Sequence, residues 1–332
     1  MMNIAVVGLG WWGRHVVGLL HGNQKLRVVA GVDVDPASAR DFATENGIVL
    51  SDDYQAVLDD PAIDGVVLVT PHSTHEALVL QAARAGKQVF CEKPLSLTAT
   101  SARKMVKACA AKGIVLGIGH ERRFETAMEK LAGMISRGEL GTIMSVEGNY
   151  SYEMAGTFAT GDWRASTAEA PAAGWTGTGV HMTDLLISML GPVREVRAVT
   201  GQRVLDRANG DLVSVQFTFV GGAVGTINVV SATPFYARLA VFGNKGWVDI
   251  HETAHAATPG ESHMYIGTPG GKRERRIYKP TNIVRRNLEA WADAVAGKSE
   301  YRFTDEQKVA NVAFMEALVR SAASGKPERV RN

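Results

Sequence analysis

A glycine-rich motif near the N-terminus constrains this chain more than any other feature. Residues 8–13 read GLGWWG and lie between a short β-branched run at residues 3–7 and a helix-like stretch at residues 14–21. In such a strand–turn–helix unit, Gly8 allows the tight turn, Gly10 lets the backbone approach a pyrophosphate, and Gly13 lets the helix pack closely on the strand. The helix N-terminus then faces the phosphates. The motif therefore predicts a dinucleotide-binding unit.

Asp33 supports the same interpretation. It follows the next predicted strand, residues 26–32, and lies 20 residues after Gly13. A carboxylate at this position accepts hydrogen bonds from the adenosine ribose and repels a 2′-phosphate. Val34 brings no cation that would offset the repulsion, although Arg40 lies one or two helical turns further on. The sequence therefore predicts NAD as the cofactor in preference to NADP.

Strand-like and helix-like segments alternate along the first part of the chain. The run GVVLVT at residues 65–70 has no polar face, which is typical of a strand buried on both sides in a parallel sheet. Further strands are predicted at residues 88–91 and 114–118, with helical stretches between them. This alternation predicts an α/β, doubly wound parallel sheet of the Rossmann type, with its ligand at the carboxyl ends of the strands. We assign residues 1–121 to this domain.

The pattern changes in the second part of the chain. Strand-like segments separated by short turns are found at residues 145–152, 193–202, 212–219, 223–231 and 238–242. Helices are predicted at residues 127–137, 180–190, 285–296 and 305–324. Residues 253–272 are rich in Gly, Pro and His and are predicted to form a surface loop. We expect residues 122–332 to form an α+β domain with a large, mainly antiparallel, open-faced sheet.

Composition argues against several other classes of protein. Lys and Arg total 36 against 34 Asp and Glu, and a net charge of +2 on 332 residues is too small for a general nucleic-acid binder. No apolar run reaches the ~18 residues of a membrane span, and the N-terminus lacks the pattern of a signal peptide. Cys91 and Cys109 cannot form a disulfide framework, and the histidines do not have metal-ligand spacing. We expect a cytoplasmic protein without a bound metal.

Motifs along nearly the whole chain resemble those of one family. Besides the glycine motif they are Thr70-Pro71 with His75, AGKQVFCEKP at residues 85–94, Arg123-Phe124, GVHMTD at 179–184, GNKG at 243–246 and ALVRSAASGK at 317–326. In these motifs the chain is similar to the Gfo/Idh/MocA oxidoreductases. The resemblance implies NAD(P)-linked redox chemistry at a carbinol of a sugar, cyclitol or related polyhydroxy compound. It also implies a homodimer or homotetramer that pairs through the open face of the second sheet.

The resemblance assigns residues to the site as well. Lys93 and His181 are expected at the reacting carbon. The expected cofactor contacts are Gly8, Gly10, Trp11, Trp12, Gly13, Asp33, Thr70, Pro71, His75, Glu92 and Lys93. Reference pKa values of about 10.4 for lysine and 6.5 for histidine favour His181 as the acid–base group near pH 7. Lys93 is then the cation that orients the substrate oxygen and stabilises a developing alkoxide.

One feature of the family is absent. The family often has an aspartate four residues before the histidine, where this chain has Gly177. Either another group supplies the carboxylate or the substrate differs from a simple polyol. His120 and Glu121 are the candidates for that group, although Glu121 could instead form a simple salt bridge with Arg122 or Arg123. Asp184 could orient the His181 ring from the same helical face. The predicted substrate contacts are His120, Glu121, Arg123, Tyr152, Trp163, Arg164 and Asp184, with Tyr150 and Trp175 expected in the same pocket.

Two other functions remain open from the sequence. Some relatives of this fold use NAD transiently, oxidising a sugar to permit elimination or epimerisation and then reducing it. A sugar-sensing or dinucleotide-sensing regulator without turnover is compatible with the missing aspartate at Gly177. The presence of Lys93 and His181 argues against the second of these.

Overall fold

The computed structural model describes residues 1–153, 162–255, 257–258 and 260–331, which form two compact units. Unit 1 contains Met1–His120 and Val284–Lys308, and unit 2 contains Glu121–Ile283 and Val309–Asn332. The first division lies next to the expected boundary at residue 121. The placement of residues 284–308 differs, because we expected them in the second domain.

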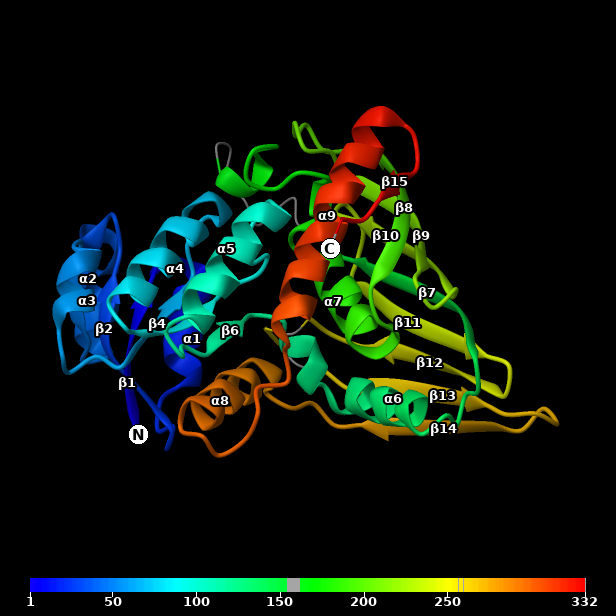
Figure 1. Ribbon diagram of the computed structural model, residues 1–332, viewed down its shortest axis with the longest axis horizontal. Helices are drawn as coiled ribbons and strands as arrows, with labels where there is room; N and C mark the ends of the chain where they lie inside the picture. The colour runs from blue at the N-terminus through cyan, green and yellow to red at the C-terminus, as the bar shows by residue number, and fades with distance from the viewer. Residues whose placement is uncertain (154–161, 256, 259, 332) are drawn as a thin grey trace. The chain divides into compact units, whose positions relative to one another are not determined.

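Unit 1 is built on a six-stranded parallel sheet (Figure 1). Its strands are β1 Met2–Val7, β2 Leu26–Val32, β3 Val49–Ser51, β4 Gly65–Leu68, β5 Gln88–Cys91 and β6 Leu116–Ile118, in the order β3-β2-β1-β4-β5-β6. All four residues of β4 are buried, which explains its run without a polar face. The predicted doubly wound sheet is confirmed, and its strand order changes direction between β1 and β4, where such folds bind ligands.

Helices connect the strands of unit 1. They are α1 Trp11–Leu19, α2 Pro36–Glu45, α3 Tyr54–Asp59, α4 His75–Arg84 and α5 Ala99–Ala110, with a short 3₁₀ helix η1 at His72–Thr74. Figure 1 shows α4 and α5 side by side. In the part of the chain that the structure describes, no helix has the length and apolar character needed to cross a membrane.

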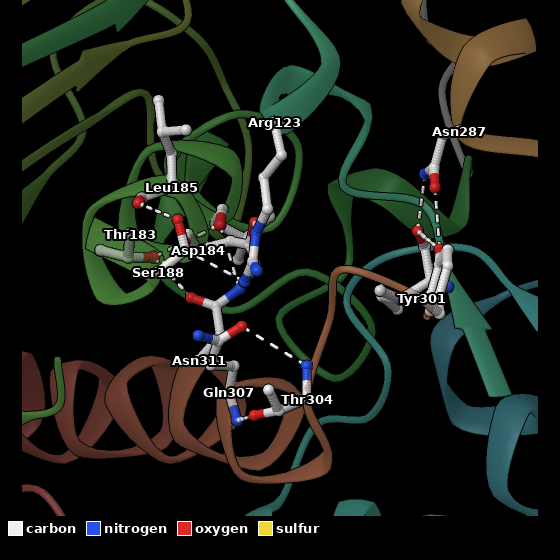
Figure 2. A network of polar contacts seen from close by, with 12 residues as sticks. Arg123, Thr183, Asp184, Leu185, Ser188, Asn287, Tyr301, Thr304, Gln307 and Asn311 are labelled. Atoms are coloured by element: carbon white, nitrogen blue, oxygen red, sulfur yellow. Dashed lines mark hydrogen bonds and ion pairs between the residues drawn. The ribbon is translucent and has the colours of Figure 1, made fainter. Parts of the chain in front are cut away.

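Helix α8 (Ile283–Val295) explains why the segment after residue 283 belongs to unit 1. Trp291 is fully buried, its ring lies 5.7 Å from that of Phe90, and its indole N–H donates to the carbonyl oxygen of Val115 at 2.9 Å. Asn287 on the same helix donates to the carbonyl oxygen of Ile118 and, in Figure 2, faces the Tyr301 hydroxyl. An apolar helical stripe in the sequence does not reveal which core it covers, so the sequence could not assign this segment.

Unit 2 contains a nine-stranded sheet. Its strands are β7 Ile143–Ser151, β8 Val193–Gly201, β9 Leu212–Phe219, β10 Val224–Val230, β11 Tyr236–Gly243, β12 Gly246–Glu252, β13 Ser262–Gly267, β14 Arg273–Tyr278 and β15 Glu328–Arg329. Their order is β14-β13-β12-β11-β7-β10-β9-β8-β15, and all neighbours are antiparallel except β7 and β10. Helices α6 (Thr126–Ser136), α7 (Gly179–Leu190) and α9 (Asp305–Ser324) lie beside this sheet in Figure 1. Alternate residues of β9 are buried, as expected for a sheet covered on one face.

Part of the predicted surface loop at residues 253–272 is a strand. Met264 and Ile266 of β13 are buried in the unit 2 core, whereas His263 and Tyr265 are less buried. The prediction of a loop was therefore wrong for residues 262–267, because the run is too short for its alternation to be recognised. Strand β14 reads RERRIY and is mostly exposed. Charged side chains are typical of an edge strand and conceal its strand character in the sequence.

Candidate active site

The glycine turn after β1 uses its three glycines in different ways. Gly8 has φ of +93°, and a Cβ there would overlap the carbonyl oxygen of Val69. A Cβ at Gly13 would overlap the carbonyl oxygen of Gly8, whereas a Cβ at Gly10 would meet no atom within 4 Å. The fold itself therefore requires Gly8 and Gly13. Gly10 is the N-cap of α1 and borders open space, which fits a pyrophosphate at the helix N-terminus.

Asp33 lies directly after β2 and holds the glycine turn. Its Oδ2 accepts the N–H of Leu9 at 2.7 Å, and its Oδ1 accepts the N–H of Asp35 at 3.0 Å. A carboxylate has about four acceptor positions, so these bonds leave capacity for ribose hydroxyls. Val34 is fully exposed beside it.

A cation that the sequence reasoning missed lies against the same turn. The guanidinium of Arg14 donates to the carbonyl oxygen of Leu9 at 2.8 Å and to that of Ser38 at 2.7 Å. The caution raised by the sequence concerned Arg40, which is exposed on α2. Arg14 bridges the glycine turn and the start of α2, so it is the arginine to consider when NAD is compared with NADP.

Glu92 and Lys93 follow β5 at the carboxyl edge of the sheet. Glu92 is buried, its Oε1 accepts the indole N–H of Trp12 at 2.8 Å, and its Oε2 accepts the backbone N–H of Lys93 at 3.1 Å. Burial raises the pKa of Glu92, although the Lys93 charge and the Trp12 hydrogen bond oppose this effect. The structure thus joins Trp12 and Glu92, two expected cofactor contacts that are distant in the sequence.

Thr70, Pro71 and His75 follow β4. The His75 ring is 0% exposed, with Nδ1 3.0 Å from the carbonyl oxygen of Pro94 and Nε2 3.1 Å from that of Thr70. The Thr70 hydroxyl lies 2.7 Å from that of Thr74. His75 therefore ties the loop after β4 to the loop after β5.

His181 is the third residue of α7 and is buried. Its Nε2 lies 3.9 Å from Oε1 of Glu121, a buried residue of the 3₁₀ helix η2 (Glu121–Phe124). This separation is too long for a hydrogen bond but short enough for strong attraction once the imidazole is protonated. A carboxylate therefore lies beside His181 within unit 2. The other candidate, His120, is a buried residue of unit 1 that follows β6.

Asp184 binds a partner other than the predicted one. Figure 2 shows its carboxylate facing the guanidinium of Arg123. Arg123 donates from Nε to Oδ2 at 2.7 Å and from Nη2 to Oδ1 at 2.6 Å, and the two side chains are only 5% and 2% exposed. We expected Asp184 to orient the His181 ring, and we expected Arg123 and Asp184 to contact substrate. The bidentate pair fastens η2 to α7, which places Glu121 and His181 indirectly. The expected substrate contacts and the orientation of the His181 ring stay predictions.

A second contact fixes α7 from its other side. The Thr183 hydroxyl lies 2.7 Å from Oδ1 of Asn311 on α9, and the Asn311 amide donates to the carbonyl oxygen of Val180 at 3.0 Å (Figure 2). No local pattern in the sequence predicts these contacts, since Thr183 and Asn311 lie 128 residues apart. The first turn of α7, which carries His181, is therefore anchored within unit 2.

Arg122 also differs from its predicted role. It is buried, pairs with Glu125 at 3.3 Å and with Glu252, and its guanidinium lies 4.6 Å from the centre of the Tyr150 ring. A simple salt bridge from Arg122 or Arg123 to Glu121 was one interpretation of the sequence. The carboxylates in these pairs are those of Glu125 and Glu252 for Arg122 and that of Asp184 for Arg123.

An aromatic cluster surrounds the end of β7. The rings of Tyr150 and Tyr152 lie 6.0 Å apart, and the His255 ring lies 5.0 Å from that of Tyr152. Burial is the largest cause of the raised pKa of both phenols, and the charge of Glu121 raises these pKa values further. Arg164 opposes the increase in the pKa of Tyr152. Tyr152, Arg164 and Glu121 therefore share one electrostatic environment, since both charges act on the Tyr152 phenol. His255, whose ring lies beside that of Tyr152, was not among the predicted site residues.

The remaining predicted pocket residues have different surroundings. Arg164 and Trp163 lie in η3 (Trp163–Ala165), with the guanidinium 4.0 Å from the indole centre and 3.3 Å from the Asp162 carboxylate. Trp175 is fully buried and stacks on Phe314 of α9, so it belongs to the core of unit 2 and was wrongly expected in the pocket. Residues 154–161, part of the loop expected to shape the pocket, lie outside the described residues.

Neither cysteine has the environment of a reactive thiol. Cys91 and Cys109 are buried and free, and burial raises the pKa of both thiols, that of Cys109 to about 11. Thiols with such pKa values are unreactive near neutral pH. Among the described residues, groups of three or more His, Cys, Asp or Glu side chains that could hold a metal ion are absent.

Two family models match the chain and together span parts of both units. Residues 2–120 match the model described as "Oxidoreductase family, NAD-binding Rossmann fold". Residues 128–249 match the model described as "GFO/IDH/MocA C-terminal domain". The chain belongs to the Gfo/Idh/MocA oxidoreductase family.

Several known proteins are similar to this chain over most of its length. Inositol 2-dehydrogenase 2 of Saccharopolyspora erythraea is 29% identical, covering 98% of this chain and 94% of that protein. The scyllo-inositol 2-dehydrogenase (NAD(+)) of Bacillus subtilis is 30% identical, covering 76% of this chain and 74% of that protein. The solved structure of GenD2 from gentamicin A biosynthesis in complex with NAD is 27% identical, with a TM-score of 0.84 over 100% of this chain and 97% of that one.

This Gfo/Idh/MocA oxidoreductase departs from the family pattern at Gly177. Gly177 lies in the turn between η4 (Ala173–Trp175) and α7, where its N–H donates to the carbonyl oxygen of Gly174 at 3.1 Å. The carboxylate beside His181 belongs instead to Glu121, on another element. The sequence made Glu121 a candidate only because it follows a strand, and nothing in its spacing identified His181 as its neighbour.

Proposed function

We propose that this protein transfers a hydride between NAD and a carbinol or carbonyl carbon of a sugar, cyclitol or related polyhydroxy compound. Bound NAD supplies the hydride acceptor or donor. In the oxidative direction the C–H bond is lost as hydride, the O–H proton passes to His181, and the carbinol becomes a carbonyl. Family membership and the dehydrogenase names of its relatives support this proposal. The observation that carries it is a buried histidine with a carboxylate 3.9 Å away, in a chain whose glycine turn leaves space for a pyrophosphate.

His181 and Lys93 have separate roles in this proposal. A lysine base near pH 7 would require a change of about 3.4 pH units from its reference value, or about 4.6 kcal/mol, whereas a histidine requires almost none. His181 is therefore the general base in oxidation and the general acid in reduction. Lys93 stays protonated, orients the substrate oxygen and stabilises its developing negative charge.

Glu121 supplies the carboxylate that the family pattern places at residue 177. Its negative charge favours the imidazolium that forms when His181 accepts the hydroxyl proton. An oxygen about 2.8 Å from both His181 Nε2 and Glu121 Oε1 would span their 3.9 Å separation at an angle of roughly 90°, so one substrate or water oxygen can contact both groups. Tyr152 and Arg164, which share the electrostatic environment of Glu121, are proposed to bind further hydroxyls.

NAD is the proposed cofactor in preference to NADP. The Asp33 carboxylate follows β2 and would repel a 2′-phosphate, whereas the Arg14 guanidinium is already bonded to two carbonyl oxygens. Titration with both dinucleotides tests this. We expect NAD to bind at least about tenfold more tightly, and Asp33→Ser to reduce the difference. Tighter binding of NADP by the unchanged protein would contradict the proposal.

We also propose a cytoplasmic homodimer or homotetramer that pairs through the face of the unit 2 sheet away from its helices. Exposed apolar side chains on this face include Val199, Val224 and Tyr236. They alternate with buried neighbours, and charged groups such as Glu147 and Arg238, 2.9 Å apart, lie between them. A mixed surface of this kind suits a subunit interface. Light scattering should detect a dimer or tetramer at micromolar concentration, and a monomer would contradict this part.

The decisive experiment follows NADH formation by the purified protein with sugars, cyclitols, sugar acids and cyclic diols. We expect NAD reduction with a subset of the polyhydroxy compounds. His181→Asn should abolish turnover while NAD still binds. If no compound reduces NAD although NAD binds in a titration, the dehydrogenase proposal fails, and transient redox chemistry or sensing becomes the function to test.

A further inference from the structure

The glycine turn carries two adjacent tryptophans with different surroundings. Trp11 is 66% exposed, whereas Trp12 is partly buried and hydrogen-bonded. Both indoles pack against the His15 ring, with centroid distances of 6.1 and 4.9 Å. A phosphate-binding turn does not need a large side chain. The presence of Trp12, with its indole hydrogen bond, therefore calls for an explanation.

The acceptor of that bond is held from three sides. Oε1 of Glu92 accepts the Trp12 indole N–H at 2.8 Å, and Oε2 accepts the backbone N–H of Lys93 at 3.1 Å. The third side is the backbone after β6, where a Cβ on Gly119 would lie 2.6 Å from the carboxyl carbon of Glu92. The absence of a side chain at Gly119 therefore leaves the space that the carboxylate fills.

We propose that Trp12 is a positioning residue for Lys93. Its indole N–H holds the Glu92 carboxylate, and this carboxylate holds the Lys93 backbone at a fixed position relative to the dinucleotide-binding turn. The proposal rests on the proposed role of Lys93 as the cation at the reacting carbon. Trp12 lies in the first turn of α1, whose N-terminus is the expected pyrophosphate site. A contact from this turn to the residue before Lys93 sets the lysine relative to the bound dinucleotide.

The charge of Glu92 is part of this arrangement. Titratable groups near it include Lys93, the Cys91 thiol and, behind the Trp12 indole, the His15 imidazole. Burial raises the pKa of Glu92, while the Trp12 hydrogen bond and the Lys93 charge favour its ionised form. Loss of the indole N–H would leave a buried carboxylate with one donor fewer and would make it easier to protonate.

Trp12→Phe tests the proposal because it keeps an aromatic ring and removes the N–H. We expect kcat to fall about 10- to 100-fold while the Kd for NAD changes less than about threefold, since a bond to an ionised group is lost. The acid limb of the kcat profile should also move to higher pH, because Glu92 then protonates at a higher pH. Trp11→Phe is the matched control, and it should retain the wild-type pH dependence whatever its effect on NAD affinity.

A second variant separates the hydrogen bond from the charge. In Glu92→Gln the amide oxygen can still accept the indole N–H but no longer titrates. We expect the acid limb due to Glu92 to disappear and Trp12→Phe to have less effect in this background than in the wild type. Equal and additive effects of the two substitutions would overturn the proposed coupling.

A measurement without turnover distinguishes this proposal from the proposed function. The chain has six tryptophans, and the indole N–H signal of Trp12 in a nitrogen-15 NMR spectrum is the one lost in Trp12→Phe. In a His15→Phe background, which removes the titratable ring beside Trp12, this signal should move with pH while Glu92 is present and stay constant in Glu92→Gln. A signal that ignores Glu92→Gln, or a Trp12→Phe protein with wild-type kcat and pH profile, overturns the positioning role. If the signal responds but no polyhydroxy compound reduces NAD, the Trp12–Glu92 contact is supported. The proposed function then fails, and the proposed role of Lys93 fails with it.

Discussion

The candidate site residues of the two units are held by different physical means. In unit 1 the backbone itself determines the dinucleotide-binding turn. A Cβ at Gly8 or Gly13 would overlap a backbone carbonyl oxygen, and the Asp33 carboxylate accepts a backbone N–H of the turn. In unit 2 the position of His181 depends on side-chain pairs between distant elements, above all Arg123 with Asp184. A position that the backbone determines requires particular residues at a recognisable spacing in the sequence. A position held by a pair of distant side chains has no such local pattern. The variants below test whether this contrast holds.

The largest expected effect comes from breaking the Arg123–Asp184 pair of unit 2. Arg123→Leu leaves a buried carboxylate without its cation and should lower the free energy of unfolding by about 3 to 5 kcal/mol. Arg137→Leu, which removes an exposed pair with Glu139, is the control and should cost less than about 1 kcal/mol. Denaturant unfolding measures both, and equal effects would show that the Arg123 pair is not the anchor of η2 and α7.

Lys93→Ala tests the chemistry proposed for unit 1 without disturbing its turn. Losing the cation at the substrate oxygen should reduce kcat by roughly 10²- to 10³-fold, since one preorganised group is removed. The Kd for NAD should change little, because the glycine turn remains intact. Lys104→Ala, which removes an exposed pair with Glu76, should leave both quantities unchanged. Full activity of Lys93→Ala in a steady-state assay would refute its assigned role.

Gly13→Ala and Gly10→Ala distinguish what the fold needs from what the ligand needs. A Cβ at Gly13 overlaps the Gly8 carbonyl, so this variant should lose about 1 to 3 kcal/mol of stability even without NAD. A Cβ at Gly10 meets open space, so that variant should keep its melting temperature and lose NAD affinity. Thermal unfolding with and without NAD measures both. Equal destabilisation of the two ligand-free proteins would contradict the comparison.

The same contrast explains how much of the molecule could be predicted. The parallel sheet, the glycine turn and Asp33 were predictable because their patterns are local and repeat with strand and helix periods. Strand β14 was not, because charged residues cover its exposed edge. Helix α8 was not, because Trp291 of its apolar face packs on Phe90, which lies 201 residues earlier in the chain.

Prediction of the site had the same limit. Glu121 was a candidate only because it follows a strand, and its position beside His181 emerges from the folded structure. The contact between Asp184 and Arg123 was not predicted, because a helix-face neighbour was considered and Arg123, 61 residues away, was not. Trp12 had no assigned role for the same reason, since its bond reaches Glu92 on another strand.

Glu121→Gln should have a smaller effect than the preceding variants. Removing the charge beside His181 makes the imidazolium less favourable, so the acid limb of kcat/KM should move to lower pH by about one pH unit and kcat should fall about tenfold. Glu121→Asp retains the charge and should restore part of both. Glu139→Gln, an exposed control, should change neither. A pH profile unaltered by Glu121→Gln would remove Glu121 from the proton-transfer step.

The smallest expected effect concerns a loop of unit 2 that is built like the unit 1 turn. The carboxylate of Asp211 accepts the backbone N–H groups of Arg203, Val204 and Leu205, as Asp33 accepts that of Leu9. Burial favours the neutral acid, but these donors prevail and lower the pKa of Asp211 below its usual value.

A depressed pKa in the folded state means that this carboxylate stabilises the protein above the pKa of the unfolded chain. The contribution is lost as the pH falls through the lower, folded-state pKa. Asp211→Asn should therefore cost about 1 kcal/mol near neutral pH, and its difference from the wild type should shrink in acid. Asp206→Asn in the same loop is the control. Because backbone donors hold Asp211, this loop should behave like unit 1, and a pH-independent difference would mean that its stability comes from side-chain packing instead.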